Sequence, residues 1–267
     1  MSLRYMVDSG RNAFEFELAA VSVSSLKPHE KVFEDAVRSL AADMRSSTMQ
    51  REPIVVDRDS MTVLDGMHRL SAARMLGLKF LLAVLVDYDA NSIRLERWWR
   101  SIRAFPDSLL KTIEEKTAGN RGEPFIVVED GVEKTYRLKT TGEKAFEEYE
   151  TLVSNIERTL GVDATPTPQP LSRGVSFGAP HLTKTDVKRM ASRGLLLPAK
   201  TTRHIFPLRV LSCPVPLRLL AEERQGGKEL LRDAVSAYIR PMDVWVAEGK
   251  DTYGGRYYDD EKLLFFI

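Results

Sequence analysis

Residues 65–69 read Asp-Gly-Met-His-Arg, a set of residue types that suits the binding of an anion. A helix that starts here would expose backbone N–H groups carrying together roughly half a positive charge, the arrangement by which many proteins bind phosphate groups. His68 and Arg69 add side-chain donors, and Gly66 allows a ligand to approach the backbone closely. The segment is therefore interpreted either as a polyphosphate site or as an ordinary strand-to-helix turn.

Apolar patterning predicts the elements that hold this segment. Residues 54–56 and 61–64 are short apolar runs separated by a polar stretch, which is typical of a β-hairpin. Residues 70–76 carry apolar side chains at helical spacing, and Gly77 stands where a helix often ends in the left-handed conformation. Residues 81–86 then predict another buried strand.

Glu30 is a second candidate for chemistry. Residues 20–23 predict a strand, residues 26–30 a turn, and residues 31–45 a helix with one buried face. Glu30 is thus expected at the helix start. There it is either a surface residue that stabilises the helix dipole or a carboxylate at the edge of a cleft.

The segment 200–204 reads Lys-Thr-Thr-Arg-His and is a second concentration of hydrogen-bond donors. Its cationic side chains and hydroxyls suit a phosphate or a carboxylate. Neighbouring prolines exclude a long helix at this place. The alternative is a polar loop between two apolar runs.

Trp98 and Trp99 are adjacent in the segment 91–103, which is expected to be helical. Neighbouring side chains on a helix cannot both face the same way. One indole is therefore expected in the core. The other is available to stack on a ligand ring or to form the wall of a pocket.

The remainder of the chain predicts structural elements and a division into parts. Several prolines between residues 166 and 180 mark a boundary or an extended crossing. We expect a first domain over 1–105, a helical and hairpin insertion over 106–165, and a C-terminal part over 166–267. The elements expected beyond residue 105 are helices over 107–118, 142–160 and 183–193 (ended by Gly194), a hairpin of 125–128 with 134–138, and a late strand over 263–267.

Composition narrows the classes of function. The 267 residues are 43% apolar, which is enough to fill a globular core. Their 39 basic and 38 acidic residues give a net charge of +1, so no global field recruits nucleic acid or an anionic membrane. The sequence has no apolar run of membrane-spanning length and no signal-peptide pattern, and a cytoplasmic location is expected. The single cysteine, Cys213, excludes an intramolecular disulfide and is expected to be a small core residue.

The order of these motifs resembles the ParB/sulfiredoxin superfamily, and within it the archaeal free serine kinases. The resemblance is carried by Leu-Lys-Pro-His-Glu-Lys at 26–31, Pro-Ile-Val-Val-Asp at 53–57, Val-Leu-Asp-Gly-Met-His-Arg-Leu at 63–70 and Lys-Thr-Thr-Arg-His at 200–204. It implies an α/β fold, with a mixed-sheet, ParB-like nucleotide-binding domain at the N-terminus. A smaller α+β part at the C-terminus would then bind the substrate.

The resemblance also implies an activity. A nucleotide, ADP or ATP with Mg²⁺, would transfer its terminal phosphoryl group to the hydroxyl of free L-serine, giving O-phospho-L-serine for cysteine synthesis. Glu30 matches the family's glutamate and is the expected general base. Asp65 is expected to be linked to the metal or to the substrate, and capping of the helix is the alternative. The binding residues implied are Gly66, Met67, His68 and Arg69 for the nucleotide, and Trp98, Thr202, Arg203 and His204 for the serine.

Other members of the superfamily supply the competing hypotheses. Sulfiredoxins carry a cysteine where this chain has Met67, and a thioether cannot perform thiol chemistry. A ParB-like partition or regulatory protein would bind nucleotide and DNA, but residues 105–165 show no helix-turn-helix pattern and the charge is near neutral. A nucleotide-binding regulator that has lost catalysis is the third hypothesis, against which Glu30 argues.

Overall fold

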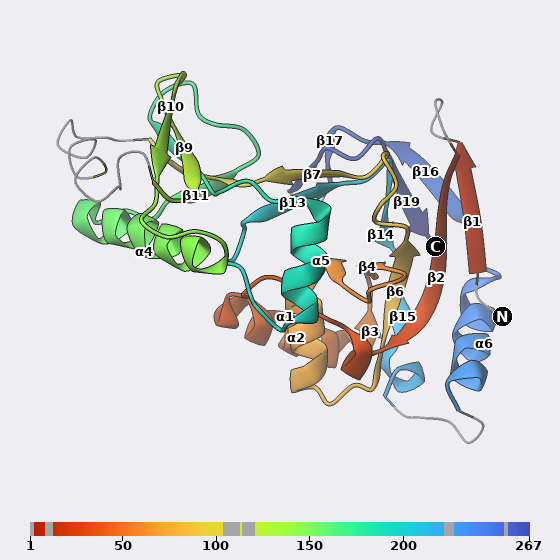
Figure 1. The fold of residues 1–267 in the computed structure, drawn as a ribbon. Coiled ribbons are helices and arrows are strands. Elements are labelled where there is room, and N and C mark those ends of the chain that lie inside the picture. The colour runs from red at the N-terminus through yellow and green to blue at the C-terminus, as the bar shows by residue number, and fades with distance from the viewer. Residues whose placement is uncertain (1–2, 9–12, 104–112, 114–120, 222–226, 254–255) are drawn as a thin grey trace. The chain divides into compact units, whose positions relative to one another are not determined.

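The computed structural model describes residues 3–8, 13–103, 113, 121–221, 227–253 and 256–267. The chain divides into two compact units. Unit 1 comprises Met1–Arg94, Val187–Leu196 and His204–Ile267, and unit 2 comprises Leu95–Asp186 and Leu197–Arg203. Figure 1 shows the elements of both.

Unit 1 is built on a five-stranded mixed sheet in the order β1-β2-β6-β4-β5. β4 runs parallel to β6, whereas the other neighbouring pairs are antiparallel. Every residue of β4 and β6 is buried, as expected for strands covered on both faces. The strands are β1 (Leu3–Asp8), β2 (Ala13–Ser22), β4 (Ile54–Asp57), β5 (Val63–Asp65) and β6 (Phe80–Val86).

Two helices pack on each other beside this sheet, α1 (Glu34–Ser47) and α2 (Met67–Met75). The apolar face of α1, with Val37, Ala41 and Met44, joins the sheet and α2 in one core. The expected hairpin, the second helix and the strand that follows are confirmed, and Gly77 has the predicted left-handed φ of 70°. The first helix begins at Glu34 and not at residue 31, so the prediction that Glu30 stands at its start is wrong.

Most of the other elements of unit 1 come from the C-terminal third of the chain. A three-stranded sheet, in the order β14-β19-β16, contains the predicted late strand as β19. The elements are β3 (Met49–Gln50), α5 (Lys184–Ser192, which crosses the unit boundary), β14 (Leu208–Ser212), β15 (Val215–Pro216), α6 (Gly227–Ile239), β16 (Val244–Glu248), β17 (Asp251–Tyr253), β18 (Arg256–Tyr258) and β19 (Lys262–Phe266), with short 3-10 turns η1 (Val23–Ser25) and η2 (Leu217–Leu219).

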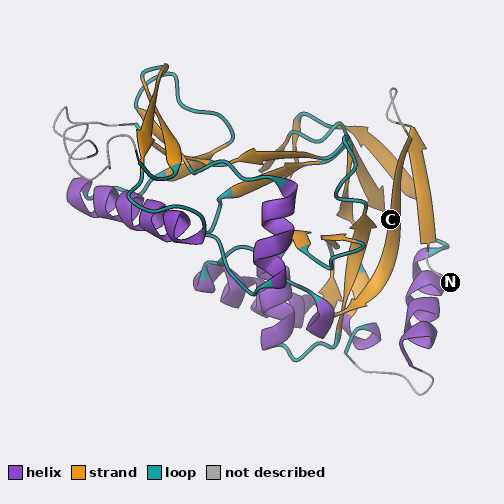
Figure 2. Cartoon of the chain, in the orientation of Figure 1, coloured by secondary structure: helices purple, strands orange, loops and turns teal. Residues whose placement is uncertain are grey.

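Unit 2 is an antiparallel sheet in the order β10-β9-β12-β8-β11, packed against α4. Figure 2 shows α4 (Glu143–Leu160) as one uninterrupted helix, as predicted. The predicted hairpin is also confirmed, with β9 paired to β10. The strands are β8 (Trp99–Ile102), β9 (Pro124–Glu129), β10 (Val132–Arg137), β11 (Thr165–Thr167) and β12 (Val175–Gly178).

Two local predictions are corrected by the structure. The segment 91–103 is not helical but forms β7 (Arg94–Arg97) and β8, because a strand places adjacent bulky side chains on opposite faces without crowding. The segment 200–204, for which a polar loop was one interpretation, enters β13 (Thr202–Ile205), a buried strand paired with β7. The helix expected over 107–118 lies outside the described residues except for Ile113. No helix in the described part of the chain is long and apolar enough to cross a membrane.

Candidate functional site

The segment 27–33 runs alongside β5 and the start of α2. The backbone N–H of Val63 donates to the carbonyl of Lys27 over 3.0 Å. His29 donates from Nδ1 to the carbonyl of Val63 over 2.8 Å, because a carbonyl can only accept. The N–H of Phe33 donates to Nε2 of His68 over 3.1 Å. These bonds fix the segment to residues 63–68 on both sides of Glu30.

Glu30 is therefore held beside the Asp-Gly-Met-His-Arg turn. Its side chain is 11% exposed, and its Oε1 lies 3.9 Å from Nε2 of the buried His29. Burial lowers the pKa of His29, although the charge of Glu30 and the bond to Val63 act in the opposite direction. The ring of His29 is thus neutral near pH 7. Glu30 is a nearly buried side chain beside the turn that begins α2.

The lowered pKa of His29 predicts a loss of stability in mild acid. The unfolded chain binds a proton to this residue below about pH 6.5, whereas the folded chain does not until its lower pKa is reached. The melting temperature should therefore fall as the pH drops below about 6.5. Glu30 and His204 are among the charged and titratable groups that face the ring. When melting temperature is measured against pH, it should fall less steeply below pH 6.5 in His29→Gln than in the parent protein. An identical slope in the two proteins would show that His29 is not the cause of the loss.

Gly66 is the N-cap of α2 and has a φ of 99°. Glycine has no side chain, so the N-cap residue itself does not occupy the first N–H groups of the helix. A Cβ at Gly66 would lie 2.5 Å from Cγ2 of Ile54. Glycine is thus required at this position both by the backbone angle and by packing.

The side chains of the turn have partners of their own. The guanidinium of Arg69 binds the carbonyl of Pro53 and, over 2.9 Å, the carboxylate of Glu52. Met67 is buried in the core. The His68 ring stacks on that of Phe33, with centroids 6.0 Å apart. The backbone N–H groups are consequently the donors that the turn itself presents to an anion.

Asp65 is paired with a residue that the sequence did not single out. Its Oδ2 lies 2.6 Å from Nη1 of Arg209 on β14, and Nε of Arg209 lies 2.6 Å from Oδ2 of the buried Asp260. Burial lowers the pKa of Arg209, but the two carboxylates outweigh that effect and raise it. A lone arginine in an apolar run gave no sequence signal for this pairing.

His204 belongs to a buried polar group in unit 1. Its Nε2 lies 2.7 Å from the hydroxyl of Tyr88, and its ring meets that of His29 edge to face at 5.6 Å. Burial raises the pKa of Tyr88, which therefore keeps its proton. The structure thus brings His204 next to His29, the neighbour of Glu30.

Trp98 and Arg203 lie together in unit 2. The guanidinium of Arg203 is 5.5 Å from the Trp98 ring centroid, and the ammonium of Lys200 is 5.3 Å from the same ring. Arg203 is buried, and its Nη1 lies 2.5 Å from Oε2 of Glu96. Trp98 is thus flanked by two cationic groups, one of which belongs to a partly buried ion pair.

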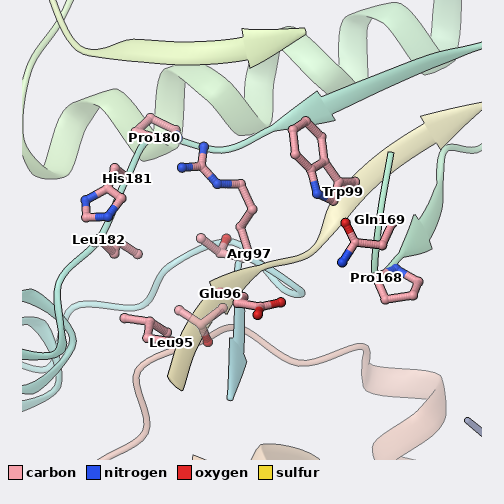
Figure 3. Close-up of a pocket in the computed structure, with 11 residues that line it drawn as sticks. Leu95, Glu96, Arg97, Trp99, Pro168, Gln169, Pro180, His181 and Leu182 are labelled. Carbon is pink, nitrogen blue, oxygen red and sulfur yellow. The ribbon is translucent and has the colours of Figure 1, made fainter. Parts of the chain in front are cut away.

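A pocket of about 330 Å³ is formed entirely by residues of unit 2 (Figure 3). Arg97 is the last residue of β7 and Trp99 the first residue of β8. The Arg97 guanidinium donates to the carbonyl of Ala179. Thr202 is the one expected site residue in the lining. The lining residues are Leu95, Glu96, Arg97, Trp99, Pro168, Gln169, Pro180, His181, Leu182, Thr201 and Thr202.

The expected site residues thus fall into two sets. Glu30, residues 65–69 and His204 belong to unit 1, whereas Trp98 and residues 202–203 belong to unit 2. Cys213 is fully buried, as predicted, and burial raises the pKa of its thiol to about 12.

Comparison with known proteins gives relatives at low identity. No protein-family model matches the chain. A ParB-like protein of Sulfolobus acidocaldarius is 28% identical over 198 residues, which cover 72% of this chain and 92% of the relative. An ATP-dependent L-serine kinase of Staphylothermus marinus is 26% identical, covering 72% and 86%. An ADP-dependent L-serine kinase of Thermococcus kodakarensis is 23% identical, covering 70% and 86%.

Solved structures share the fold. SbnI from Staphylococcus aureus, with a C-terminal truncation, superposes with a TM-score of 0.64 at 19% identity, covering 83% of this chain and 96% of that one. A variant of a free serine kinase in complex with AMP gives 0.62 at 17% identity, covering 76% and 93%. The predicted resemblance to ParB-like proteins and archaeal serine kinases and the predicted mixed α/β fold are confirmed.

Proposed function

We propose that this protein is a nucleotide-dependent kinase that phosphorylates the hydroxyl of free L-serine and releases O-phospho-L-serine, a precursor for cysteine synthesis. The observation that carries the proposal is the placement of Glu30. Bonds from His29 to Val63 and from Phe33 to His68 hold this carboxylate beside the start of α2, where the N-cap residue is a glycine. An acid next to a phosphate-binding turn is the arrangement that phosphoryl transfer to a hydroxyl requires.

In this proposal the start of α2 binds the phosphates of the donor. The N–H groups after Gly66 supply hydrogen bonds and the positive end of the helix dipole. His68 and Arg69 contribute by fixing the geometry of the turn through Phe33 and Glu52. Glu30 accepts the proton of the serine hydroxyl as the new O–P bond forms.

The acceptor is assigned to residues around Arg203. A free amino acid carries a carboxylate and an ammonium group, and the ion pair of Arg203 with Glu96 presents one partner for each. Trp98 flanks the guanidinium, and Thr202 lines the neighbouring pocket. His204 would contribute through its bond to Tyr88.

Mg²⁺ belongs to the proposal as a companion of the nucleotide. The described residues contain no group of three or more His, Cys, Asp and Glu side chains placed to hold a metal ion. Mg²⁺ characteristically uses one or two carboxylates and takes its remaining ligands from substrate phosphates and water. We therefore propose that Mg²⁺ enters the site bound to the phosphates of the nucleotide. There it would neutralise charge on the phosphoryl group that is transferred.

One assay tests donor and acceptor together. The protein is incubated with Mg²⁺ and L-serine and with either ADP or ATP, and phosphorus NMR identifies the products. We expect O-phosphoserine together with AMP from ADP, or with ADP from ATP. The related kinases include both ADP- and ATP-dependent proteins, so both donors are tested. If neither ADP nor ATP gives phosphoserine, the proposal is refuted.

A second candidate function follows from the ParB-like relative. In that case the protein would bind nucleotide and DNA without kinase activity. A gel-shift titration at low and at physiological salt distinguishes the two, since specific binding survives the higher salt better than non-specific binding. Specific DNA binding without phosphoserine formation would favour this candidate.

Arg203 gives a prediction for the acceptor. Arg203→Lys keeps the charge but loses the planar fork that meets a carboxylate with two hydrogen bonds. The KM for serine should rise about tenfold while the KM for nucleotide changes little. Arg100→Lys is the matched control, since Arg100 also forms an ion pair in unit 2, with Glu157. If both substitutions raise the KM for serine equally, Arg203 is not part of the serine site.

A further inference from the structure

The pocket of unit 2 is lined by a cation, Arg97, that lacks a carboxylate partner among the described residues. Its guanidinium donates to the carbonyl of Ala179 and forms no ion pair within the described part of the chain. A guanidinium has five N–H donors and keeps its charge in proteins, and a neutral carbonyl does not balance that charge. Burial lowers the pKa of Arg97, although Tyr149 and Glu133 act in the opposite direction. An anionic ligand would supply the missing countercharge.

Glu96 is the other Asp, Glu, Lys or Arg side chain in the described lining, and it is already paired. Its Oε2 lies 2.5 Å from Nη1 of Arg203, whose guanidinium lies near the Trp98 ring. Neither Arg203 nor Trp98 is among the described residues that line the pocket. The pocket therefore adjoins the residues to which we assign the acceptor, but its unbalanced charge is that of Arg97.

Trp99 gives the pocket an apolar wall beside this cation. A Cβ added to Gly178 would lie 2.8 Å from Cζ3 of Trp99 and 3.1 Å from Cδ of Arg97, so both side chains pack against the same glycine. Figure 3 shows the indole and the guanidinium in the same pocket. The other apolar residues of the lining are Leu95, Pro168, Pro180 and Leu182. A ligand that fits this lining combines an anionic group with a flat apolar body.

Hydroxyl groups hold one wall of the pocket in place. Thr167 donates from Oγ1 to the carbonyl of Gln169 over 2.7 Å, and the same Oγ1 lies 2.7 Å from Oγ of the buried Ser101. Ser101 in turn lies 2.8 Å from Oγ of the buried Ser176. The cavity measures about 330 Å³, which is within the range of small-molecule sites, about 300–1,000 Å³.

We infer that this pocket is a binding site for a small carboxylate with a flat apolar body, in which Arg97 binds the carboxylate and Trp99 packs against the body. A carboxylate is favoured over a phosphate because the described lining offers one unbalanced cation, and the charge of Glu96 would repel a second negative charge. The planar fork of arginine meets a carboxylate with two hydrogen bonds. The site is additional to the proposed kinase activity and does not depend on it.

Benzoate is the probe for this site, and nuclear magnetic resonance of the indole N–H groups is the measurement. The chain has three tryptophans, and Trp99→Phe identifies the signal of Trp99. Benzoate should shift that signal saturably, with a Kd of about 1–10 mM. Benzyl alcohol has the ring without the charge and inorganic phosphate has charge without the ring, so each should bind at least about tenfold more weakly.

These comparisons use the parent protein alone, so they hold even if a pocket variant does not fold. Binding of benzyl alcohol or phosphate as tight as that of benzoate would overturn the inference. The absence of any benzoate-induced shift up to about 50 mM would overturn it as well. An excess of L-serine should leave benzoate bound, and displacement would identify the pocket as the acceptor site instead.

Arg97→Gln tests the cation directly. Glutamine loses the charge but keeps an N–H donor for the carbonyl of Ala179, and benzoate should bind at least about tenfold more weakly. Arg137→Gln is the matched control, because Arg137 also lies in unit 2 and donates to a backbone carbonyl, that of Gly122, over 3.0 Å, but does not line the pocket. Equal losses in the two variants would overturn the role of Arg97. Benzoate binding by a protein that forms no phosphoserine would refute the kinase proposal and support this inference.

Discussion

Replacement of Glu30 by glutamine is expected to reduce phosphoserine formation by about 10² to 10⁴-fold while ADP or ATP still binds. Glutamine keeps the size of the side chain but cannot accept a proton at neutral pH. Since the segment is held by bonds from His29 and Phe33, neither of which involves the Glu30 side chain, the turn should keep its shape. Product formation is measured by mass spectrometry and nucleotide affinity by calorimetry.

Glu34→Gln is the matched control for that experiment. Glu34 lies in the first turn of α1, is 83% exposed and pairs with Arg38. A surface ion pair of this kind contributes little to stability, so activity should be unchanged. Full activity in Glu30→Gln would exclude the general-base role. Loss of nucleotide binding in that variant would instead assign Glu30 to the donor site.

Substitution of Gly66 by alanine is expected to have the second large effect. The residue has a φ of 99°, and an added Cβ would lie 2.5 Å from Ile54 and 2.9 Å from the Arg69 guanidinium. Ile54 is fully buried in β4. We expect a loss of roughly 2–4 kcal/mol in the free energy of unfolding, from backbone strain and overpacking together. The displaced helix start should also weaken ADP binding at least about tenfold.

Gly77→Ala provides the control for Gly66→Ala. Gly77 also has a positive φ, of 70°, but an added Cβ meets nothing within 4 Å. Its substitution should cost only the backbone term of about 1–2 kcal/mol and should not change nucleotide affinity. Urea denaturation measures stability and calorimetry measures binding. If both variants lose the same free energy of unfolding and both still bind nucleotide, Gly66 is required only for the backbone conformation of the turn.

The elements around the turn could be predicted from the sequence because their signals are local. Alternating and helical apolar spacing over 54–86 identifies two strands, a helix and a further strand, and Gly77 marks the helix end. The resemblance then led to the prediction that Glu30 and the turn belong to one nucleotide-binding domain. The same reasoning failed over 91–103, where two tryptophans with few turn signals fitted a helix, but pairing with β12 and β11 stabilised a strand.

The partners of the candidate residues could not be predicted in this way. Asp65 and Arg209 are 144 residues apart in the chain, Tyr88 and His204 116, and Glu96 and Arg203 107. Nothing in the local pattern around Arg209 separates a buried arginine with two carboxylate partners from a surface one. Such pairs form only where packing removes the groups from water and makes an unpaired charge costly.

The sequence by itself determined the strand-to-helix turn with its glycine, the helices that accompany it and the family resemblance, because each depends on residues close together in the chain. The tertiary structure decided which donors the turn presents. It engages the side chains of Arg69 and His68 with Glu52 and Phe33, and it makes Gly66, which has no side chain, the N-cap of α2. It also draws Asp65 to Arg209. The physical reason is that a charged side chain takes the partner that burial places beside it, and burial is a property of the whole fold.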